Sequence, residues 1–317
     1  MSMPSPTDIR RIAVIGAGVI GSGWVTHFLA RGFEVTVADP VPGAKDRLAA
    51  FIGQAWPAVR ELGLAPNADP DAWTFLPDTE QAIEGAEFVQ ENGPDNEDVK
   101  REIYAQIDAV APPDVAIASS SSALLMTPIQ KGLRHPKRCF LGHPFNPPHM
   151  IPLVEVSGGE ETDPAVLDWA VNFYDAIGKK SARLNREISG HIAGRLGAAV
   201  WREAVSLVDQ GIADAAAVDA AMSHGPGLRY ALAGPTMIFH MGGGPEGLRH
   251  YLEHLGASQE RRWASMVVPK LTPELCEKLV AGAEAQAAGR SVAELENERD
   301  ACLAAVLKAI ALVRGGA

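Results

Sequence analysis

The first half of the chain alternates short apolar runs with longer amphipathic stretches. The apolar runs are three to five residues long and are bounded by Gly, Asp or other polar residues, which is typical of buried strands. The strands expected from them are 12–15, 34–38, 87–90, 115–118, 139–142, 153–156 and 182–184, with one more inside 67–77. Helical patterns such as 19–31, 44–62 and 99–110 lie between them. Strands that alternate with helices predict βαβ units, so we expect an α/β fold with a doubly wound, mostly parallel sheet.

The second half, from residue 188, shows no convincing strand pattern. We expect helices at 192–210, 213–222, 245–255, 273–288 and 292–313. Clusters of Gly and Pro separate them at 225–227, 234–235 and 242–245 and predict loops. The 317 residues exceed the roughly 250–300 that one hydrophobic core usually serves. We therefore expect two domains, a sheet domain at 1–187 and an all-α domain at 188–317.

Composition and charge narrow the class of protein. The chain has 39 acidic residues against 28 Lys and Arg, a net charge of −11, so no nucleic acid partner is expected. Cys139, Cys276 and Cys302 lie far apart, which predicts neither a disulfide framework nor a zinc site, and no metal is expected. Residues 1–11 lack the apolar core of a signal peptide, and no apolar stretch approaches the ~20 residues of a membrane helix. We expect a cytoplasmic protein with no membrane partner.

A glycine-rich turn follows the first predicted strand and opens a helix. It reads Gly16-Ala17-Gly18-Val19-Ile20-Gly21, the G-x-G-x-x-G pattern of a Rossmann-like dinucleotide-binding domain. Asp39 lies 18 residues after Gly21, at the end of the second predicted strand, where an acid accepts hydrogen bonds from the adenosine ribose. A carboxylate there repels a 2′-phosphate, so NAD is expected rather than NADP. A turn that binds nothing, or an FAD site, is the alternative.

Three blocks between residues 119 and 156 carry further candidate chemistry. Four serines, Ser119–Ser122, follow a predicted strand; then come Gly142-His143-Pro144-Phe145-Asn146-Pro147 and the apolar run 152–156 with Glu155 inside it. In these blocks the sequence resembles the 3-hydroxyacyl-CoA dehydrogenase family, in which a Ser, a His, an Asn and a Glu lie at these spacings. The resemblance extends over nearly the whole chain and implies an NAD-dependent dehydrogenase acting on a CH–OH group.

The resemblance also points to a branch of the family. It is greatest to the branch that oxidises L-carnitine, near the L-gulonate 3-dehydrogenase (lambda-crystallin) branch. The blocks behind it are 142–147, 201–204, 227–230, 247–250 and 289–291 with 294–296. It implies oxidation of the 3-hydroxyl of a small hydroxy acid, with L-carnitine as the first choice, and a homodimer formed through the helical domain. L-gulonate, 3-hydroxybutyryl-CoA and a structural, non-catalytic NAD-binding role are the alternatives.

Alcohol oxidation needs a base that takes the hydroxyl proton while hydride leaves. The neutral imidazole of His143 suits this role near pH 7. It needs a carboxylate that fixes its tautomer and stabilises the imidazolium, and the resemblance implies that this carboxylate is Glu155. The resemblance gives Ser122 to the substrate hydroxyl and Asn146 to the nicotinamide or a substrate oxygen. The residues expected to contact the cofactor are Gly16, Gly18, Val19, Ile20, Gly21 and Asp39, to which the resemblance adds Asp95, Lys100, Ser122 and Asn146.

Each role has a structural alternative. His143 could satisfy a turn, and Glu155 could lie on the solvent face of an edge strand. The serines could form a solvated loop or a helix cap. Asp95 could cap the helix that starts near residue 96, and Lys100 could lie on the exposed face of that helix.

Two departures from the family pattern bear on the substrate. Gly194 stands where the family has an active-site Asn, in Gly190-His191-Ile192-Ala193-Gly194-Arg195-Leu196. We expect the nearby His191 to cover the helix surface, with its intrusion into the vacated space as the alternative. Ala55 and Leu62 stand where the acyl-CoA branch holds CoA with a Ser and a Lys, so a small free acid is expected. The resemblance implies that Arg229 binds its carboxylate, because the branches that act on free carboxylates carry Arg in this block, and a guanidinium suits a carboxylate. A structural ion pair is the alternative.

Overall fold

Eight strands form a single sheet in the computed structural model, which describes residues 3–315. The strands are β1 (Arg11–Ile15), β2 (Glu34–Ala38), β3 (Trp73–Leu76), β4 (Phe88–Glu91), β5 (Ala116–Ser119), β6 (Cys139–Pro144), β7 (Leu153–Gly158) and β8 (Lys180–Arg183). Each lies within two or three residues of its predicted position. The predicted α/β class with a doubly wound, mostly parallel sheet is confirmed.

The strand order is β3-β2-β1-β4-β5-β6-β7-β8. The chain runs outward from β1 through β2 to β3 and then returns to β4 on the other side of β1. Ligands of open α/β sheets bind at such a reversal, beyond the carboxyl ends of the strands. All neighbours pair in parallel except β6 and β7, which are antiparallel and place His143 directly opposite Glu155.

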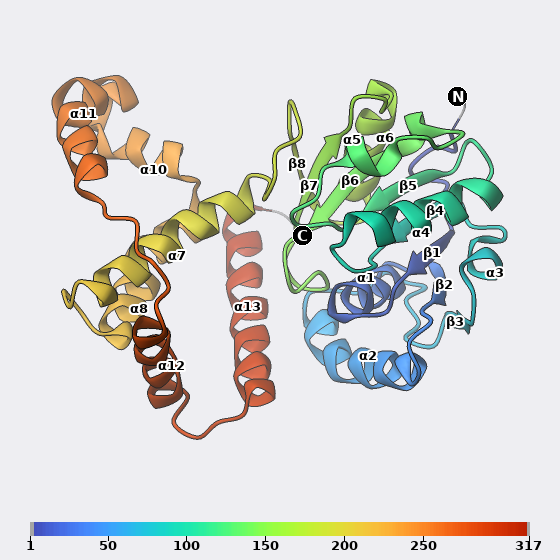
Figure 1. The fold of residues 1–317 in the computed structure, drawn as a ribbon, viewed down its shortest axis with the longest axis horizontal. Coiled ribbons are helices and arrows are strands. Elements are labelled where there is room, and N and C mark those ends of the chain that lie inside the picture. The colour runs from blue at the N-terminus through green and yellow to red at the C-terminus, as the bar shows by residue number, and fades with distance from the viewer. Residues whose placement is uncertain (1–2, 316–317) are drawn as a thin grey trace. The chain divides into compact units, whose positions relative to one another are not determined.

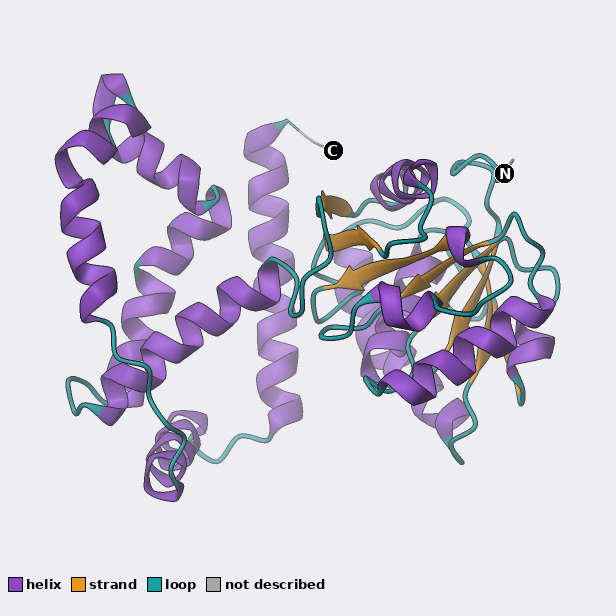
Figure 2. Cartoon of the chain, turned by 45° about the horizontal axis from the view of Figure 1, so that its top comes forward, coloured by secondary structure: helices purple, strands orange, loops and turns teal. Residues whose placement is uncertain are grey.

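Helices cover both faces of the sheet (Figures 1 and 2). The core on one face contains side chains of α1 (Val19–Ala30), α2 (Ala44–Glu61) and α6 (Pro164–Ala176), and the core on the other contains those of α3 (Thr79–Ile83), α4 (Glu97–Val110) and α5 (Met126–Gln130). Side chains along each strand alternate between the two cores: Ile12 and Val14 enter the first, and Ala13 and Ile15 the second. Because both faces are buried, the strands read as continuous apolar runs.

The chain divides into two compact units. The first contains Met1–Arg195 and also Asp300–Ala309, a part of the last helix, α13 (Val292–Arg314). Within this unit Ala304 belongs to the first core, and Lys308 forms an exposed ion pair with Glu61 of α2. The predicted domain boundary at 187/188 remains a prediction.

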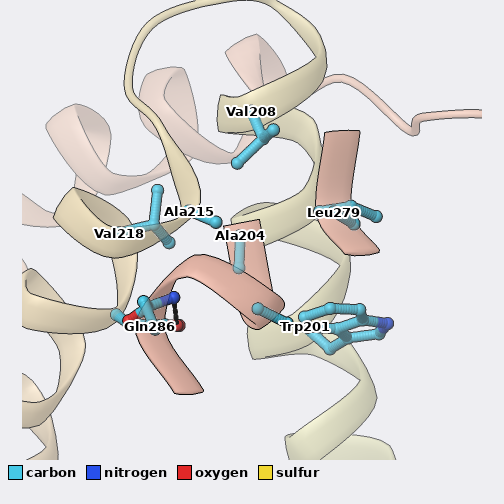
Figure 3. A pocket seen from close by; sticks show the side chains of 9 residues that line it. Trp201, Ala204, Val208, Ala215, Val218, Leu279 and Gln286 are labelled. Atoms are coloured by element: carbon cyan, nitrogen blue, oxygen red, sulfur yellow. Dashed lines mark hydrogen bonds between the residues drawn. The ribbon is translucent and has the colours of Figure 1, made fainter. Parts of the chain in front are cut away.

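In the second unit, Leu196–Arg299 with Ile310–Ala317, the described residues up to 315 form helices and the loops that join them. The helices are most of α7 (Ala193–Asp209), then α8 (Ala215–His224), α9 (Pro226–Leu232), α10 (Pro235–Gly242), α11 (Leu248–Ser265), α12 (Pro273–Ala287) and the two ends of α13. Its small core is formed by Val205, Val208 and Leu275. Beside it a pocket of about 100 Å³ lies among α7, α8 and α12 (Figure 3), where Gln286 donates a hydrogen bond to Asp219.

The Gly and Pro clusters of this unit do not all form loops, so part of that prediction is wrong. Pro226 and Pro235 each occupy the first turn of a short helix, α9 and α10. Proline is well suited there, because its fixed φ matches the helix and its missing N–H would have had no partner in the first turn. Helix α11 also extends to Ser265, ten residues beyond the expected end. Within residues 3–315, no helix has the length and apolar character needed to cross a bilayer.

Candidate active site

The glycine-rich turn between β1 and α1 has the geometry of a phosphate-binding loop. Gly16 has φ +92°, and a Cβ on it would lie 2.8 Å from the carbonyl oxygen of Asn92. A Cβ on Gly21 would lie 1.9 Å from the carbonyl oxygen of Gly16. A Cβ on Gly18, by contrast, would have nothing within 4 Å. Two glycines are therefore needed for packing, and the third leaves an open cradle at the helix N-terminus, which fits the pyrophosphate of a dinucleotide.

Asp39 lies beside this turn, at the end of β2. Its two carboxylate oxygens accept hydrogen bonds from the backbone N–H of Ala17 at 2.7 Å and of Val41 at 2.8 Å. The carboxylate is half-buried and keeps further lone pairs for ribose hydroxyls. Val19 is exposed and Ile20 half-buried on the first turn of α1. These residues fit NAD at the reversal of the sheet.

His143 and Glu155 form a buried pair on neighbouring strands. Nδ1 of His143 lies 3.1 Å from Oε2 of Glu155, and the two residues are 8 % and 1 % exposed. The other carboxylate oxygen, Oε1, accepts the backbone N–H groups of Ile192 at 2.7 Å and Ala193 at 2.9 Å. A carboxylate on Nδ1 fixes the proton there and leaves Nε2 of a neutral His143 as a base.

The electrostatics of the pair keep Glu155 ionised. Burial alone raises the pKa of this carboxyl group, but the hydrogen bonds from His143, Ala193 and Ile192 outweigh burial and lower the pKa. The alternative in which Glu155 lies on the solvent face of an edge strand is wrong, because β7 is paired on both sides, with β6 and β8.

Ser122 is the one exposed serine of the run Ser119–Ser122, and it contacts Asp95. Its hydroxyl donates to Oδ2 of Asp95 at 2.7 Å and its backbone N–H donates to the same atom at 3.1 Å. Burial raises the pKa of Asp95, but hydrogen bonds from Ser121 and Ser122 outweigh it, so the pKa is lowered. Asn96, not Asp95, caps α4, so the capping alternative for Asp95 is wrong.

Lys100 is 1 % exposed, so its alternative placement on the exposed face of α4 is wrong. Its ammonium donates to Glu91 at 2.8 Å and 3.0 Å and to the carbonyl oxygen of Gly93 at 3.0 Å. These three hydrogen bonds of Lys100 fix the start of the loop that follows β4. Glu91 and Asn92 were not predicted from the sequence, although both come at the end of β4, where the carboxyl edge of the sheet meets the glycine-rich turn.

His191 is buried, not on the helix surface, so that expectation is wrong. It is 1 % exposed, and its ring centroid lies 4.8 Å from that of His143. Its backbone has φ +45° and follows Gly190 at φ +76°. Two successive left-handed residues turn the side chain inward just before α7 begins.

The remaining candidates are distributed more widely. Asn146 is exposed in the turn after β6 of the first unit, and Arg229 is exposed on α9 of the second unit. Ala55 is buried and Leu62 packs against the first core, so neither provides a polar contact to a ligand. Among residues 3–315, no three His, Cys, Asp or Glu side chains gather as they would around a metal ion.

Comparison with known proteins agrees with this geometry. The family model described as 3-hydroxyacyl-CoA dehydrogenase, NAD binding domain, matches residues 11–188, and the model of the C-terminal domain of the same family matches residues 190–286. The chain belongs to the 3-hydroxyacyl-CoA dehydrogenase family. It is accordingly an oxidoreductase that uses NAD as its cofactor and acts on a CH–OH group.

Similar members of this dehydrogenase family carry a more specific name. L-carnitine dehydrogenase of Streptomyces coelicolor is 47 % identical over 97 % of this chain and 96 % of its own length. L-carnitine dehydrogenase of Pseudomonas putida is 41 % identical over the same shares of the two chains. Among solved structures, the NAD⁺-dependent 5-formyl-3-hydroxy-2-methylpyridine 4-carboxylic acid 5-dehydrogenase superposes with a TM-score of 0.82 and is 27 % identical, covering 95 % of this chain and 98 % of that one.

The open cradle at Gly18 gives the first testable prediction. Gly18→Ala adds a methyl group that meets nothing in the protein, so we expect an unchanged unfolding midpoint. We expect the pyrophosphate in the space that the methyl group fills, so the Kd for NADH should rise about tenfold or more, measured by NADH fluorescence titration. Gly53→Ala on α2 adds a methyl group equally free of contacts and serves as the control, with an unchanged Kd. NADH binding by Gly18→Ala as tight as wild type would show that the cofactor does not approach this turn.

Proposed function

We propose that this protein is an NAD⁺-dependent L-carnitine dehydrogenase, which oxidises the 3-hydroxyl of L-carnitine to give 3-dehydrocarnitine. The observation that carries the proposal is the identity of 41–47 % to L-carnitine dehydrogenases over nearly the whole chain. Identity of this extent spans both the cofactor turn and the block around His143. We also propose a cytoplasmic location, which the three unpaired cysteines Cys139, Cys276 and Cys302 support.

In this proposal His143 is the general base. Its Nε2 takes the proton of the substrate hydroxyl, and the C–H hydride leaves in the same step. Bound NAD⁺ supplies the hydride acceptor. Glu155 is ionised and bonded to Nδ1, so it stabilises the imidazolium that forms, without itself taking the proton. Burial of the pair strengthens this electrostatic stabilisation, because water is excluded from the contact.

In the same proposal, residues around His143 and Glu155 position the substrate and the cofactor. Ser122 bonds the substrate hydroxyl; because the single proton of that hydroxyl goes to His143, the Ser122 hydroxyl turns from Asp95 and donates to the substrate oxygen, while the backbone N–H of Ser122 still bonds Asp95. Asn146 holds the nicotinamide amide or a substrate oxygen. The cofactor contacts are those of the glycine-rich turn with Asp39, supported by Asp95 and by Lys100, which acts through the loop after β4.

Turnover of a defined substrate tests the proposal. NAD⁺ is mixed with L-carnitine, L-gulonate, 3-hydroxybutyrate or 3-hydroxybutyryl-CoA, and NADH absorbance is followed. L-carnitine should give the highest kcat/KM. His143→Ala should lower kcat by about 10³-fold or more, since base catalysis and its electrostatic support are both lost, while the Kd for NADH stays unchanged. Preference for another acid would replace carnitine in the proposal, and no turnover of any of the four would favour a non-catalytic NAD-binding protein.

We further propose that Arg229 binds the carboxylate of the substrate. A guanidinium pairs with a carboxylate through two parallel hydrogen bonds, which suits a small free acid better than a thioester. The apolar Ala55 and Leu62 at the places where CoA would be held support the same choice.

Arg229→Ala should therefore raise the KM for L-carnitine about tenfold or more and change kcat little, because the carboxylate is held equally in substrate and transition state. Arg249→Ala provides the control, since Arg249 is an exposed arginine of the same unit in a similar Gly-Leu-Arg context. An unchanged KM in Arg229→Ala would remove Arg229 from the substrate site.

We also propose a homodimer formed through the helical domain, residues 188–317. Large apolar side chains of the second unit are exposed there, among them Trp201 at 57 %, Leu228 at 60 % and Trp263 at 65 %. A mostly apolar groove of about 640 Å³ lies beside them, lined by residues of α7, α8, α9 and α11 that include Tyr230 and Trp263. Exposed apolar patches of this kind are typical of protein–protein interfaces.

Light scattering after gel filtration tests the dimer. The wild-type protein should have twice the chain mass of 33.6 kDa. Trp263→Glu should shift the mass to that of one chain, because a charge in an apolar interface is costly to bury. Val110→Glu changes a residue of α4 in the first unit that is 41 % exposed and should leave the mass unchanged. A wild-type mass of one chain at micromolar concentration would refute the dimer.

A further inference from the structure

His191 combines three unusual features beside the catalytic pair. It has a left-handed backbone at φ +45°, although it is not glycine. Its side chain is 1 % exposed, and its Nδ1 has no hydrogen-bond partner among residues 3–315. The strained backbone and the unpartnered buried nitrogen both cost free energy, and native proteins keep such costs mainly where function needs the arrangement.

The hydrogen bond of the other ring nitrogen fixes the tautomer of His191. Nε2 lies 2.9 Å from the backbone carbonyl oxygen of Ser121. A carbonyl only accepts, so Nε2 carries the proton and Nδ1 of the neutral ring has none. The acceptor is the residue just before Ser122, so this bond restrains the backbone from which the Ser122 hydroxyl extends.

The segment that carries His191 has further hydrogen bonds to the loop between β5 and α5 (residues 120–125, here called the serine loop) and to the start of α5. Glu187 accepts the backbone N–H groups of Met126 and Thr127, and Ser189 donates to the carbonyl oxygen of Ala123. On the other side, Ile192 and Ala193 donate to Glu155. His191 therefore lies between the serine loop and the His143–Glu155 pair.

Charged and titratable groups face His191 from three elements: His143 on β6, Glu155 on β7 and Asp95 in the loop after β4. Burial lowers the pKa of His191, and the neighbouring His143 lowers it further, against the opposite effects of the Ser121 carbonyl, Glu155 and Asp95. His191 thus remains neutral to a lower pH than an ordinary histidine. A neutral neighbour adds no repulsion to the imidazolium that His143 forms during turnover.

We propose that His191 is a positioning residue of the dehydrogenase site, which holds the Ser121–Ser122 backbone through Nε2–H and packs its neutral ring against His143. The inference rests on the proposed function, because it assigns His191 to the site in which His143 and Ser122 act. It explains why a residue with a strained backbone and an unpartnered nitrogen stands at this point of the chain.

Kinetics of a double-mutant cycle test the role. His191→Phe keeps a ring of similar shape but loses the donor to Ser121, and kcat should fall about tenfold while the Kd for NADH is unchanged. Because His191 acts through Ser122, the double variant Ser122→Ala/His191→Phe should be within about twofold of Ser122→Ala alone. His191→Gln restores a donor and should recover part of kcat. Fully multiplicative effects of the two substitutions would overturn the proposal.

The pH profile separates positioning from a general loss of stability. A charged His191 would repel the imidazolium that forms on His143 during turnover. In the wild type, log kcat/KM should therefore fall with slope one on the acid side and steepen towards two at lower pH, where His191 also takes a proton. In His191→Phe the slope should remain one. His27→Phe is the matched control: His27 is also buried, and its Nε2 lies 3.1 Å from the carbonyl oxygen of Ile177, away from the pair. It should keep the wild-type profile, and the same profile in His191→Phe would overturn the proposal.

Imidazole ¹⁵N spectra of the NAD-free protein test the tautomer without any turnover. His191 should show a protonated Nε2 and an unprotonated Nδ1 at pH 6.5, and His27→Phe should leave these signals in place. If no acid is turned over but the tautomer is as stated, the proposed function fails and the placement of His191 stands. If His191 is charged at pH 6.5, the inference about His191 fails on its own.

Discussion

One buried carboxylate, that of Glu155, joins the elements on which the candidate site depends. Oε2 holds the His143 ring across the antiparallel β6–β7 pair, while Oε1 accepts the first backbone N–H groups of the segment entering α7. A buried charge is tolerated only where several donors replace water, and here three donors do so. The carboxylate that bonds Nδ1 of His143, the proposed base, therefore also positions the segment that carries His191. This carboxylate lies opposite His143 because β7 pairs with β6 in the antiparallel direction.

A second polar network connects the residues that follow β4 and β5, at the carboxyl ends of the central strands, and we expect it to stiffen this part of the sheet. The hydroxyl of Ser120 accepts from Trp24 and Gln90 and donates to Asn92, while Tyr174 donates to Gln90. Fully satisfied networks of this kind stiffen a core, since moving one member leaves the others unpaired in a low dielectric. Asn92 also limits the room beside Gly16. The network thus links the glycine-rich turn to the serine loop, the two segments expected to contact cofactor and substrate.

The sheet could be predicted from the sequence because its signals are local. Ile12, Ala13 and Val14 form an uninterrupted apolar run, since both faces of the strand are buried, and the glycine-rich turn follows directly. The antiparallel pairing of β6 and β7, which is not a local property, could not be predicted. His191 was misplaced because its position depends on two successive left-handed residues; Gly190 was the available signal. The clusters that contain Pro226 and Pro235 predict loops between helices, but each proline instead begins a short helix, because proline is also typical of a first helical turn.

Gly194 stands where the family has an asparagine, and the structure shows whether packing requires glycine there. Its φ is not in the left-handed region, and a Cβ at this position would meet nothing within 4 Å. Neither backbone strain nor crowding at the Cβ position therefore requires glycine. By contrast, Gly16 and Gly21 are required by backbone conformation or contact. Packing within the described residues therefore gives no reason for glycine at position 194, in contrast to the two glycines of the turn between β1 and α1.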